Sequence, residues 1–374
     1  MAESTVYFTD FHPVGGRSVL QKLSILMKKA GMGEIDFDRK LTAIKMHFGE
    51  PGNLAFLRPN YAKAVADFVK ERGGVPFLTD CNTLYPGRRK NALEHMDAAY
   101  ENGFSPLSTG CQIVIGDGLK GTDDVEVPVV GGEYVKTARI GRAVMDADVF
   151  ISLAHFKGHE ATGFGGALKN IGMGCGSRAG KMAQHNSGKP SVDQSLCVGC
   201  RACARECGQN ALSYGADRKA SIDHEKCVGC GRCIGACNFD AISNDNGSAN
   251  AELDCKMAEY AKAVVDGRPQ FHINIVRDIS PMCDCHGEND VAILPDIGMF
   301  ASLDPVAVDQ ASAEACLAQE PLPGGMLLER MRKPGFVDHH DHFVNTTDGT
   351  DWESCLVHAE KIGLGSRKYK LITV

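Results

Sequence analysis

The residues most able to do chemistry in this chain are cysteines spaced as C-x2-C-x2-C-x3-C. This pattern occurs twice between Cys197 and Cys237 and uses eight of the 16 cysteines. A tight loop with this spacing can place three thiolates around one iron-sulfur cubane, whereas the fourth thiolate, one helical turn further on, reaches the other cluster. The spacing therefore predicts two [4Fe-4S] clusters, one held by Cys197, Cys200, Cys203 and Cys237 and the other by Cys227, Cys230, Cys233 and Cys207.

The cysteine segment resembles the bacterial two-cluster ferredoxin module over residues 189–245. It departs from that family at Gly208 and Asn238, where a proline usually follows the fourth cysteine, but no ligand is lost. Zinc binding and a disulfide framework are the alternatives. Zinc sites separate their cysteine pairs by longer spacers, and nothing in the sequence indicates an oxidising compartment, so we favour the clusters.

A second polar stretch follows an apolar strand predicted at residues 149–154. His155, Lys157 and His159 alternate along it, so their side chains should share one side of an extended segment. Polar groups at the carboxyl end of a strand, followed by a glycine-rich helix start, are typical of ligand sites in open α/β sheets. We expect His155 or His159 to act as general acid or base and Lys157 to hold a carboxylate or phosphate.

The helix after this strand is expected to begin near Thr162. Thr162 would cap it, and the neighbouring glycines would let an anionic ligand approach the free N-H groups of its first turn. The alternative is that the two histidines cap and pack, with the glycines present for close helix contact.

Further candidates follow other predicted strands and complete a cleft in which a cofactor could bind. They are His47, Glu50, Asp80, Cys283 and Cys285. The two cysteines stand next to His286, and two thiols with an imidazole are compatible with a soft metal, so an additional metal in the cleft is one expectation. Two reduced cysteines in a loop are an equally good explanation.

Other conspicuous residues have simpler explanations. Asp304 is a good N-cap and Pro305 a good first helical residue, which leaves Asp309 as the remaining site candidate of that stretch. His339, His340 and His342 lie in a stretch without cysteines or regular spacing, which is more typical of a solvated surface than of a ligand set.

Charge and hydropathy limit the classes of partner. The formal net charge is −7 and no basic run is longer than Arg88-Arg89-Lys90, which argues against nucleic acid. No apolar run reaches the length of a membrane span and the N-terminus lacks a signal-peptide pattern, so we expect a cytoplasmic protein without a membrane partner. The expected partners are a redox protein or a small-molecule substrate.

Strand-like and helix-like segments alternate on both sides of the cysteine segment. This pattern predicts a layered α/β fold with a mixed or parallel sheet. Its two parts are residues 1–188 and 246–374, and a small α+β ferredoxin-like domain at 189–245 interrupts them. Within these parts we also expect a hairpin that pairs residues 125–130 with 133–138 and a strand at 291–294.

Five separated motifs together resemble the iron-sulfur proteins of domain-of-unknown-function family 362. They are His47-Phe-Gly-Glu50, Thr79-Asp-Cys-Asn-Thr-Leu-Tyr85, His155-Phe-Lys-Gly-His159 with Gly163-Phe-Gly-Gly-Ala-Leu-Lys-Asn170, Cys283-Asp-Cys285, and Asp304-Pro-Val-Ala-Val-Asp-Gln310. This resemblance implies an α/β body with a ferredoxin insert but no particular activity. A more distant likeness is to lactate racemase, which holds a nickel-pincer cofactor through a lysine and a histidine.

Three functions are consistent with these features. The first is an iron-sulfur oxidoreductase whose two clusters pass electrons to or from a substrate or partner site in the α/β body, because a ferredoxin alone needs only the insert. The second is a racemase-like isomerase of a small acid with a further metal cofactor. The third is a non-catalytic electron carrier that docks on another enzyme.

Overall fold

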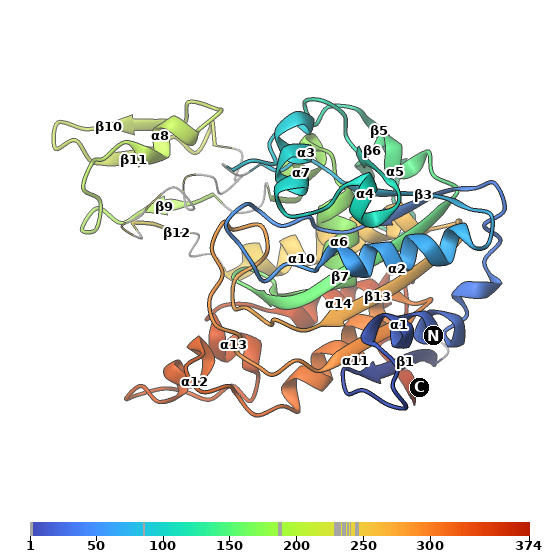
Figure 1. Ribbon diagram of the computed structural model, residues 1–374. Helices are drawn as coiled ribbons and strands as arrows, with labels where there is room; N and C mark the ends of the chain where they lie inside the picture. The colour runs from blue at the N-terminus through green and yellow to red at the C-terminus, as the bar shows by residue number, and fades with distance from the viewer. Residues whose placement is uncertain are drawn as a thin grey trace.

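The computed structural model describes residues 3–84, 87–185, 189–227, 233, 237, 239, 241–243 and 247–374. A nine-stranded sheet lies at its centre and contains strands from both ends of the chain (Figure 1). In spatial order the path is β15 (Tyr369–Thr373), β1 (Ser4–Asp10), β14 (Gly298–Ser302), β13 (Gln270–Val276), β7 (Val149–His159), β2 (Leu41–Lys45), β3 (Val75–Asp80) and β4 (Gln112–Ile115), with β8 (Gly163–Gly165) paired to the end of β7.

Most neighbouring strands of the sheet are parallel. β4, β3, β2, β7 and β13 run in one direction, and β1 and β15 are parallel to each other. On the path, β14 is the strand that runs antiparallel to its two neighbours, β1 and β13. The predicted α/β fold with a mixed, largely parallel sheet is therefore confirmed.

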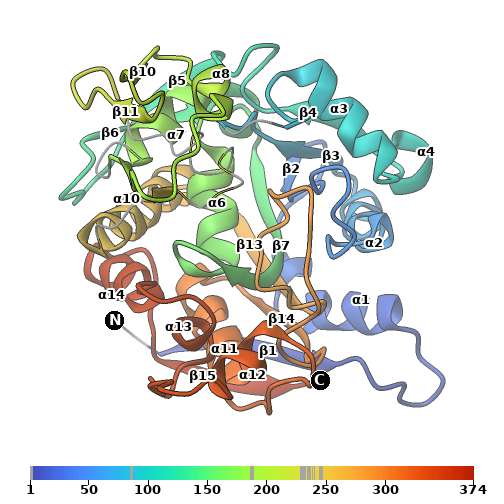
Figure 2. The ribbon, with the colours of Figure 1, turned by 90° about the vertical axis from the view of Figure 1, so that its left-hand side faces the viewer.

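Helices cover both faces of the sheet (Figure 2). α1 and α2 pack on one face in an apolar cluster with Ile44 and Ile151, whereas α6, α10, α11 and α14 pack on the other with Ala43 and Phe150. The helices are α1 (Val19–Lys29), η1 (Met32–Glu34), α2 (Pro59–Lys70), α3 (Ala92–Glu101), α4 (Pro106–Thr109), α5 (Arg142–Met145), α6 (Ala167–Cys175), α7 (Arg178–His185), α8 (Ala202–Glu206), α10 (Gly247–Val265), α11 (Pro305–Leu317), α12 (Met326–Met331), α13 (His342–Thr346) and α14 (Trp352–Lys361).

Local sequence explains the elements that frame the sheet. All residues of β7 are buried, as expected for a central parallel strand covered on both faces. α1 begins with a capping box in which Ser18 and Gln21 satisfy each other's backbone N-H groups. α2 begins at Pro59, whose missing N-H would be unpaired in any first turn. The chain leaves β2 through α2 on one face and leaves β7 through α6 and α10 on the other, and the order of the sheet reverses between β2 and β7.

Two expected elements differ from the structure. The strand expected at 291–294 is wrong: this run is irregular, although Ile293 and Leu294 are buried and fill the core from a loop. The strand in this region is β14, whose Gly, Ala and Ser carry little strand signal. The hairpin is confirmed with a longer connection, because β5 (Asp124–Pro128) pairs with β6 (Thr137–Gly141).

The described strands of the cysteine segment pair among themselves rather than with the large sheet. β9 (Ser191–Val192) pairs with β12 (Ile242–Ser243), and β10 (Leu212–Tyr214) pairs with β11 (Ala220–Ile222). In Figure 1 these strands and α8 lie to one side of the α/β body. The boundaries expected at 188/189 and 245/246 stay a prediction, because residues 188, 245 and 246 lie outside the described ones.

Within the described part of the chain, no helix combines the length and the apolar character that crossing a lipid bilayer requires.

Candidate functional site

One pocket lies where the order of the sheet reverses. It is lined from the carboxyl ends of β2, β3 and β7, from the loop after β13, and from β8, α6, α7 and α10, and it has an empty volume of about 850 Å³. In open α/β sheets this reversal point is where ligands bind, because the two chain crossovers leave in opposite directions and open a crevice. The fold therefore places a candidate site at the ends of β2 and β7.

Three of the expected catalytic residues line this pocket. The strand predicted to end at 154 continues through His159, where it pairs with β8, so His155, Lys157 and His159 alternate along regular strand. All three are buried. Their catalytic roles stay a prediction.

His155 is held at both ring nitrogens. Its Nδ1 lies 2.9 and 3.0 Å from the two carboxylate oxygens of Asp284, and its Nε2 donates to the Arg277 carbonyl at 2.7 Å. Both ring nitrogens are therefore engaged within the protein. Its geometry suits the holding of Asp284 better than proton exchange with a ligand.

Asp284 is a site residue that the sequence reasoning passed over. It is wholly buried and also lies 3.4 Å from the Lys157 Nζ. Burial alone would raise the pKa of this carboxyl, but the charges of His155 and Lys157 outweigh burial and hold the pKa well below its ordinary value. The feature of the sequence that could have identified Asp284 is its position between two candidate site residues, Cys283 and Cys285. A carboxylate buried at such a site must be paired with a cation or a hydrogen-bond donor.

His159 presents the opposite hydrogen-bonding pattern. Its Nδ1 accepts from the backbone N-H groups of Ala161 and Thr162, both at 3.1 Å. Burial lowers the pKa of His159 to about 4. The ring is therefore neutral at pH 7 with its proton on Nε2, which makes His159 a hydrogen-bond donor in the pocket wall.

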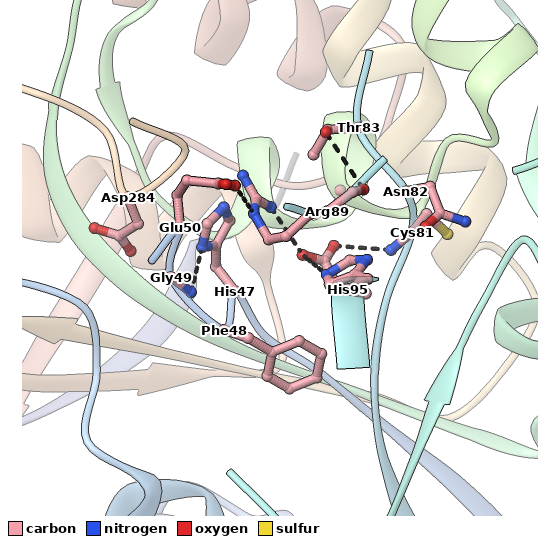
Figure 3. A network of polar contacts seen from close by, with 12 residues as sticks. His47, Phe48, Gly49, Glu50, Cys81, Asn82, Thr83, Arg89, His95 and Asp284 are labelled. Carbon is pink, nitrogen blue, oxygen red and sulfur yellow. Dashed lines mark hydrogen bonds and ion pairs between the residues drawn. The ribbon is translucent and has the colours of Figure 1, made fainter. Parts of the chain in front are cut away.

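A second group of charges lies on the β2 and β3 side (Figure 3). The buried Arg89 donates from Nε to Glu50 at 2.8 Å, and its Nη1 lies 3.7 Å from Asp80. Lys45 approaches the other Asp80 oxygen at 3.0 Å. Burial opposes ionisation of Asp80, but Lys45 and the neighbouring cations outweigh it and lower the pKa of this carboxyl. Lys45 and Arg89 thus join the expected residues Glu50 and Asp80 in one ion-pair network.

Two neutral histidines belong to the same group. His47 accepts a hydrogen bond at Nδ1 from the Gly49 N-H at 2.9 Å, and burial, with the charge of Arg89, lowers its pKa well below the ordinary value. His95 lies 3.7 Å from Asp80, and burial lowers the pKa of His95 to about 3. Figure 3 shows Arg89 between Glu50 and His95. His47 lines the pocket. Glu50 is not among the lining residues and instead binds Arg89, which is.

The two thiols of the loop after β13 also line the pocket. The Lys169 Nζ donates to the Cys283 sulfur at 3.2 Å. A hydrogen bond from Cys285 and the charge of Lys169 lower the pKa of Cys283 despite its burial, while the same hydrogen bond and burial raise the pKa of Cys285. The ligand atoms of His159, Cys283 and Cys285 lie within 4.8 Å of one another, as do those of Glu160, Cys285 and His286. The site therefore contains candidate metal-binding groups.

The expected anion site at the start of α6 is wrong. Asp309 fills it: its carboxylate accepts from the Ala167 N-H at 2.6 Å and from the Leu168 N-H at 2.8 Å. Thr162 does not cap the helix, because its hydroxyl donates to the Phe164 carbonyl instead. Asp309 thus serves the helix rather than a ligand, whereas Asp304 caps α11 as predicted.

Two lysines of the pocket have no ion pair with a carboxylate among the described residues. Lys169 contacts Cys283, and Lys181 donates to the Gly176 carbonyl at 2.6 Å. Among the described residues neither ammonium group has a carboxylate in ion-pair contact. Since Lys45, Arg89 and Lys157 are paired with Asp80, Glu50 and Asp284, the pocket carries excess positive charge and suits an anion.

Four of the cysteines predicted to share one cluster line a single smaller pocket. Cys197, Cys200, Cys203 and Cys237 surround an empty volume of about 320 Å³. Hydrogen bonds reach the sulfurs in this segment from the Ala220 N-H to Cys197 at 3.4 Å and from the Ala211 N-H to Cys207 at 3.3 Å. Of the second set, Cys230 lies outside the described residues.

The chain is similar to a curated protein and to solved structures. The chain is 30% identical over 168 residues to the thylakoid-associated protein sll1697 of Synechocystis sp., and the match covers 42% of this chain. It spans 46% of the length of that relative.

Both solved structures are remote. One is a crystal structure of a Thermotoga maritima protein, with 14% identity, a TM-score of 0.42, and coverage of 82% of this chain and 59% of that one. The other is the lactate racemase apoprotein of Thermoanaerobacterium thermosaccharolyticum, with 12% identity, a TM-score of 0.39, and coverage of 99% and 83%. Likenesses this weak carry no conclusion about activity.

The family comparison covers more of the chain. The family described as domain of unknown function DUF362 matches residues 42–314, which include the pocket residues from Lys45 to Cys285 and the whole cysteine segment. The resemblance seen in five short motifs therefore holds over most of the sequence. The chain belongs to the DUF362 family.

Proposed function

We propose that this chain is an iron-sulfur oxidoreductase that acts on a small anionic substrate in the pocket of the α/β body. Segment 189–245 would hold two [4Fe-4S] clusters with the ligand sets given above. When bound, such clusters accept and release one electron at a time. A redox partner protein would exchange electrons at this segment. The cysteine content suits a reducing compartment such as the cytoplasm.

The observation that carries the proposal is the convergence of four thiols on one pocket. Cys197, Cys200 and Cys203 come from one loop, whereas Cys237 comes from the second run, more than 30 residues later. This is the sharing between runs that two-cluster ferredoxins require. The backbone N-H group directed at the Cys197 sulfur fits a thiolate that bears charge.

The attachment of the cysteine segment supports its connection to the pocket. His185, at the end of α7, and Leu253, in α10, lie on either side of the segment in sequence, and both line the pocket. The segment therefore leaves and rejoins the body beside the candidate substrate site, which favours a shared function over an unrelated appendage.

Charge supports the choice of substrate class. An ammonium group without a counter-ion is costly to bury, and the buried Lys181 and the half-buried Lys169 both line the pocket without a carboxylate partner among the described residues. A carboxylate or phosphate would supply the missing charge. Lys157, which we expected to bind it, is already paired with Asp284, so its role would be to fix that loop and leave binding to the other two lysines.

Within the pocket, His159 would hydrogen-bond the substrate. Its neutral ring carries the proton on Nε2, and a donor of this kind can stabilise negative charge on a substrate without a net charge of its own. His155 and Asp284 would orient the loop that carries the thiols. We therefore assign hydrogen bonding of the substrate to His159 and positioning to His155.

The first test is anaerobic purification followed by iron and acid-labile sulfide analysis and EPR after reduction. We expect two clusters' worth of iron and sulfide, and about half of both in Cys197→Ser. The matched control is Cys316→Ala, a buried thiol of α11 outside both runs, which should keep the full content. Colourless protein with zinc in place of iron would overturn the proposal.

The second test addresses the anion. Calorimetric binding of inorganic phosphate and of malonate should show at least one of them bound, with roughly tenfold weaker binding for Lys181→Met because one charge-assisted contact is lost. Lys28→Met, on the exposed face of α1, is the control. Equal affinity of the parent protein, Lys181→Met and Lys28→Met would show that Lys181 does not bind the anion.

A further inference from the structure

The loop that carries Cys283 and Cys285 is fixed in place. The Gly158 N-H donates to the Ser280 carbonyl at 2.9 Å, and a Cβ at Gly158 would come within 2.9 Å of Pro281, so only glycine lets the strand and the loop lie this close. The His286 N-H closes the other side by donating to the Cys283 carbonyl at 3.1 Å. The two thiols are therefore held at the pocket rather than carried by a loose segment.

The two sulfurs are neighbours in a cationic setting. Cys283 is buried in the pocket wall and Cys285 is partly exposed. Their sulfur atoms lie within 4.8 Å of each other, and the Lys169 Nζ lies 3.2 Å from the Cys283 sulfur. An ammonium group at this distance stabilises the thiolate, which is the nucleophilic form of cysteine.

Metal binding is the competing explanation, and the hydrogen bonds of His159 disfavour it. A metal-bound histidine coordinates through one nitrogen and donates the proton of the other to an acceptor. The Nδ1 of His159 instead faces two N-H donors, which puts the proton on Nε2. That Nε2 lies on the side of Glu160, at 3.6 Å, and is not available as a ligand atom while it is protonated.

The charge of the pocket disfavours a metal for a second reason. Lys169 is in contact with Cys283, and Lys157 lies on the same wall. A divalent cation would add its charge to these ammonium groups at short distance, whereas a thiolate neutralises them. The same surroundings that oppose a metal favour a reactive thiolate.

We propose that Cys283 and Cys285 are a redox-active dithiol that reduces a low-molecular-mass disulfide bearing carboxylate groups. Lys181, whose ammonium group contacts a carbonyl rather than an acid, is the cation that remains to select the carboxylates when the Cys283 thiolate neutralises Lys169. The pair goes beyond the proposed function, because its thiol chemistry needs no iron.

The exchange balances without a further reagent. The Cys283 thiolate attacks one sulfur of the substrate disulfide, which forms a mixed disulfide and releases the first substrate thiolate. Cys285 then loses its proton to that thiolate and attacks the Cys283 sulfur, which forms the Cys283–Cys285 disulfide and releases the second substrate thiolate to be protonated by solvent. The substrate gains two electrons, and the cysteine pair loses two.

The test uses the full chain, purified anaerobically and incubated with oxidised glutathione, a disulfide with carboxylates. After acid quenching and alkylation, mass spectrometry of the peptide that contains residues 283 and 285 reads out the result. We expect that peptide to lose two hydrogen atoms and to take no alkyl group. The same digest should show Cys111 and Cys316, which are buried and isolated, fully alkylated.

Variants resolve the two roles. Cys285→Ser should trap glutathione on Cys283, and Lys169→Met should slow the reaction about tenfold because thiolate is lost. Lys28→Met is the matched control and should react at the parent rate. Cys285 is partly exposed, so its replacement by serine keeps the fold even where replacement of the buried Cys283 does not.

Two outcomes would overturn the dithiol. One is a peptide that stays reduced and fully alkylated after glutathione treatment. The other is stoichiometric zinc or nickel that blocks alkylation of both cysteines until a chelator removes it. Absence of iron with a disulfide at 283–285 would instead defeat the proposed function and leave the dithiol standing.

Discussion

The pocket of the α/β body and the cysteine segment are built in opposite ways. The pocket draws Lys45, Asp80, His159, Lys169 and Cys283 from distant parts of the chain and sets them in a large apolar core. The cysteine segment has its functional residues close together in sequence. Its own apolar cluster is small and consists of Cys203, Cys233, Ala220 and Ile242, with a few partly buried neighbours.

This difference indicates what holds each region together. A segment of this size with so little aliphatic core needs a metal or another cross-link for stability. The body buries charged groups that are held by packing and by one another, so its pocket exists before any ligand binds. We therefore expect the segment to depend on the proposed clusters and the body to depend on its ion pairs.

Removal of iron should give the largest effect and should separate the two regions. After anaerobic chelation, amides of β10 and β11 should lose their protection from hydrogen exchange, because folding of the segment is coupled to metal binding. Amides of β7 should stay protected, and fluorescence of Trp352, the single tryptophan, should report an unchanged melting transition of the body. Full protection of β10 and β11 after chelation would show that the segment does not need a metal for its stability.

The next largest effect is expected for Asp284→Asn in the body. It leaves the Lys157 ammonium group buried without its ion-pair partner and takes the carboxylate from His155, which typically costs about 3–5 kcal/mol of unfolding free energy. Urea unfolding followed by Trp352 fluorescence measures this. The matched control is Asp67→Asn, whose partner Lys63 is exposed, with an expected loss below about 1 kcal/mol. Similar losses for both would mean that the buried pair is not what stabilises the pocket loop.

Acid should weaken the body through its buried neutral histidines. Burial lowers the pKa of His272 to about 3, so between pH 6.5 and that value the unfolded chain binds a proton that the folded chain does not, and stability falls as pH falls. His272→Asn should remove roughly 2 kcal/mol of the loss between about pH 6.5 and 4.5.

The control for this titration is His340→Asn, whose ring is 90% exposed and should leave the pH dependence unchanged. Unfolding curves at several pH values give the slope, and Trp352 restricts the readout to the body. An unchanged slope in His272→Asn would show that this ring does not set the acid sensitivity.

The smallest effect concerns the tuning of a cluster in the segment. The Tyr214 hydroxyl lies 3.3 Å from the Cys203 sulfur, and a hydrogen bond to a ligand sulfur stabilises the reduced, more negative state. Tyr214→Phe should therefore shift one midpoint potential to a more negative value with unchanged iron content, as measured by an EPR-monitored redox titration. Tyr100→Phe, exposed on α3, should shift neither potential.

The sequence predicted those features of the fold that short patterns encode. Pro59 marks the first residue of α2, and Asp304 caps α11 as its type and position indicated. Hydrophobic runs located β3, β7 and β13, but the run at 291–294 packs as a loop, since burial of a few apolar residues does not require a strand. β14 was not predicted, because its glycine, alanine and serine have low strand propensity and its conformation depends on packing in the core.

The site could be predicted only in part. His155, Lys157 and His159 were identified by their position after a strand, and the structure brings them beside Cys283 and Cys285. Asp284, Lys169 and Arg89 gave no local signal of their roles, since each acts on a residue far away in sequence. Thr162 had the expected local pattern of a cap, yet Asp309 from another helix occupies the start of α6.

What the sequence determined by itself is the α/β pattern and the spacing of the two cysteine runs, because both depend on patterns along a few turns of chain. The tertiary structure decided which charges face one another: the reversal of strand order between β2 and β7 brings the ends of four strands together. Charge pairing across more than 100 residues, such as His155 with Asp284, depends on that topology and on the low polarity of the core, and neither can be read from local sequence.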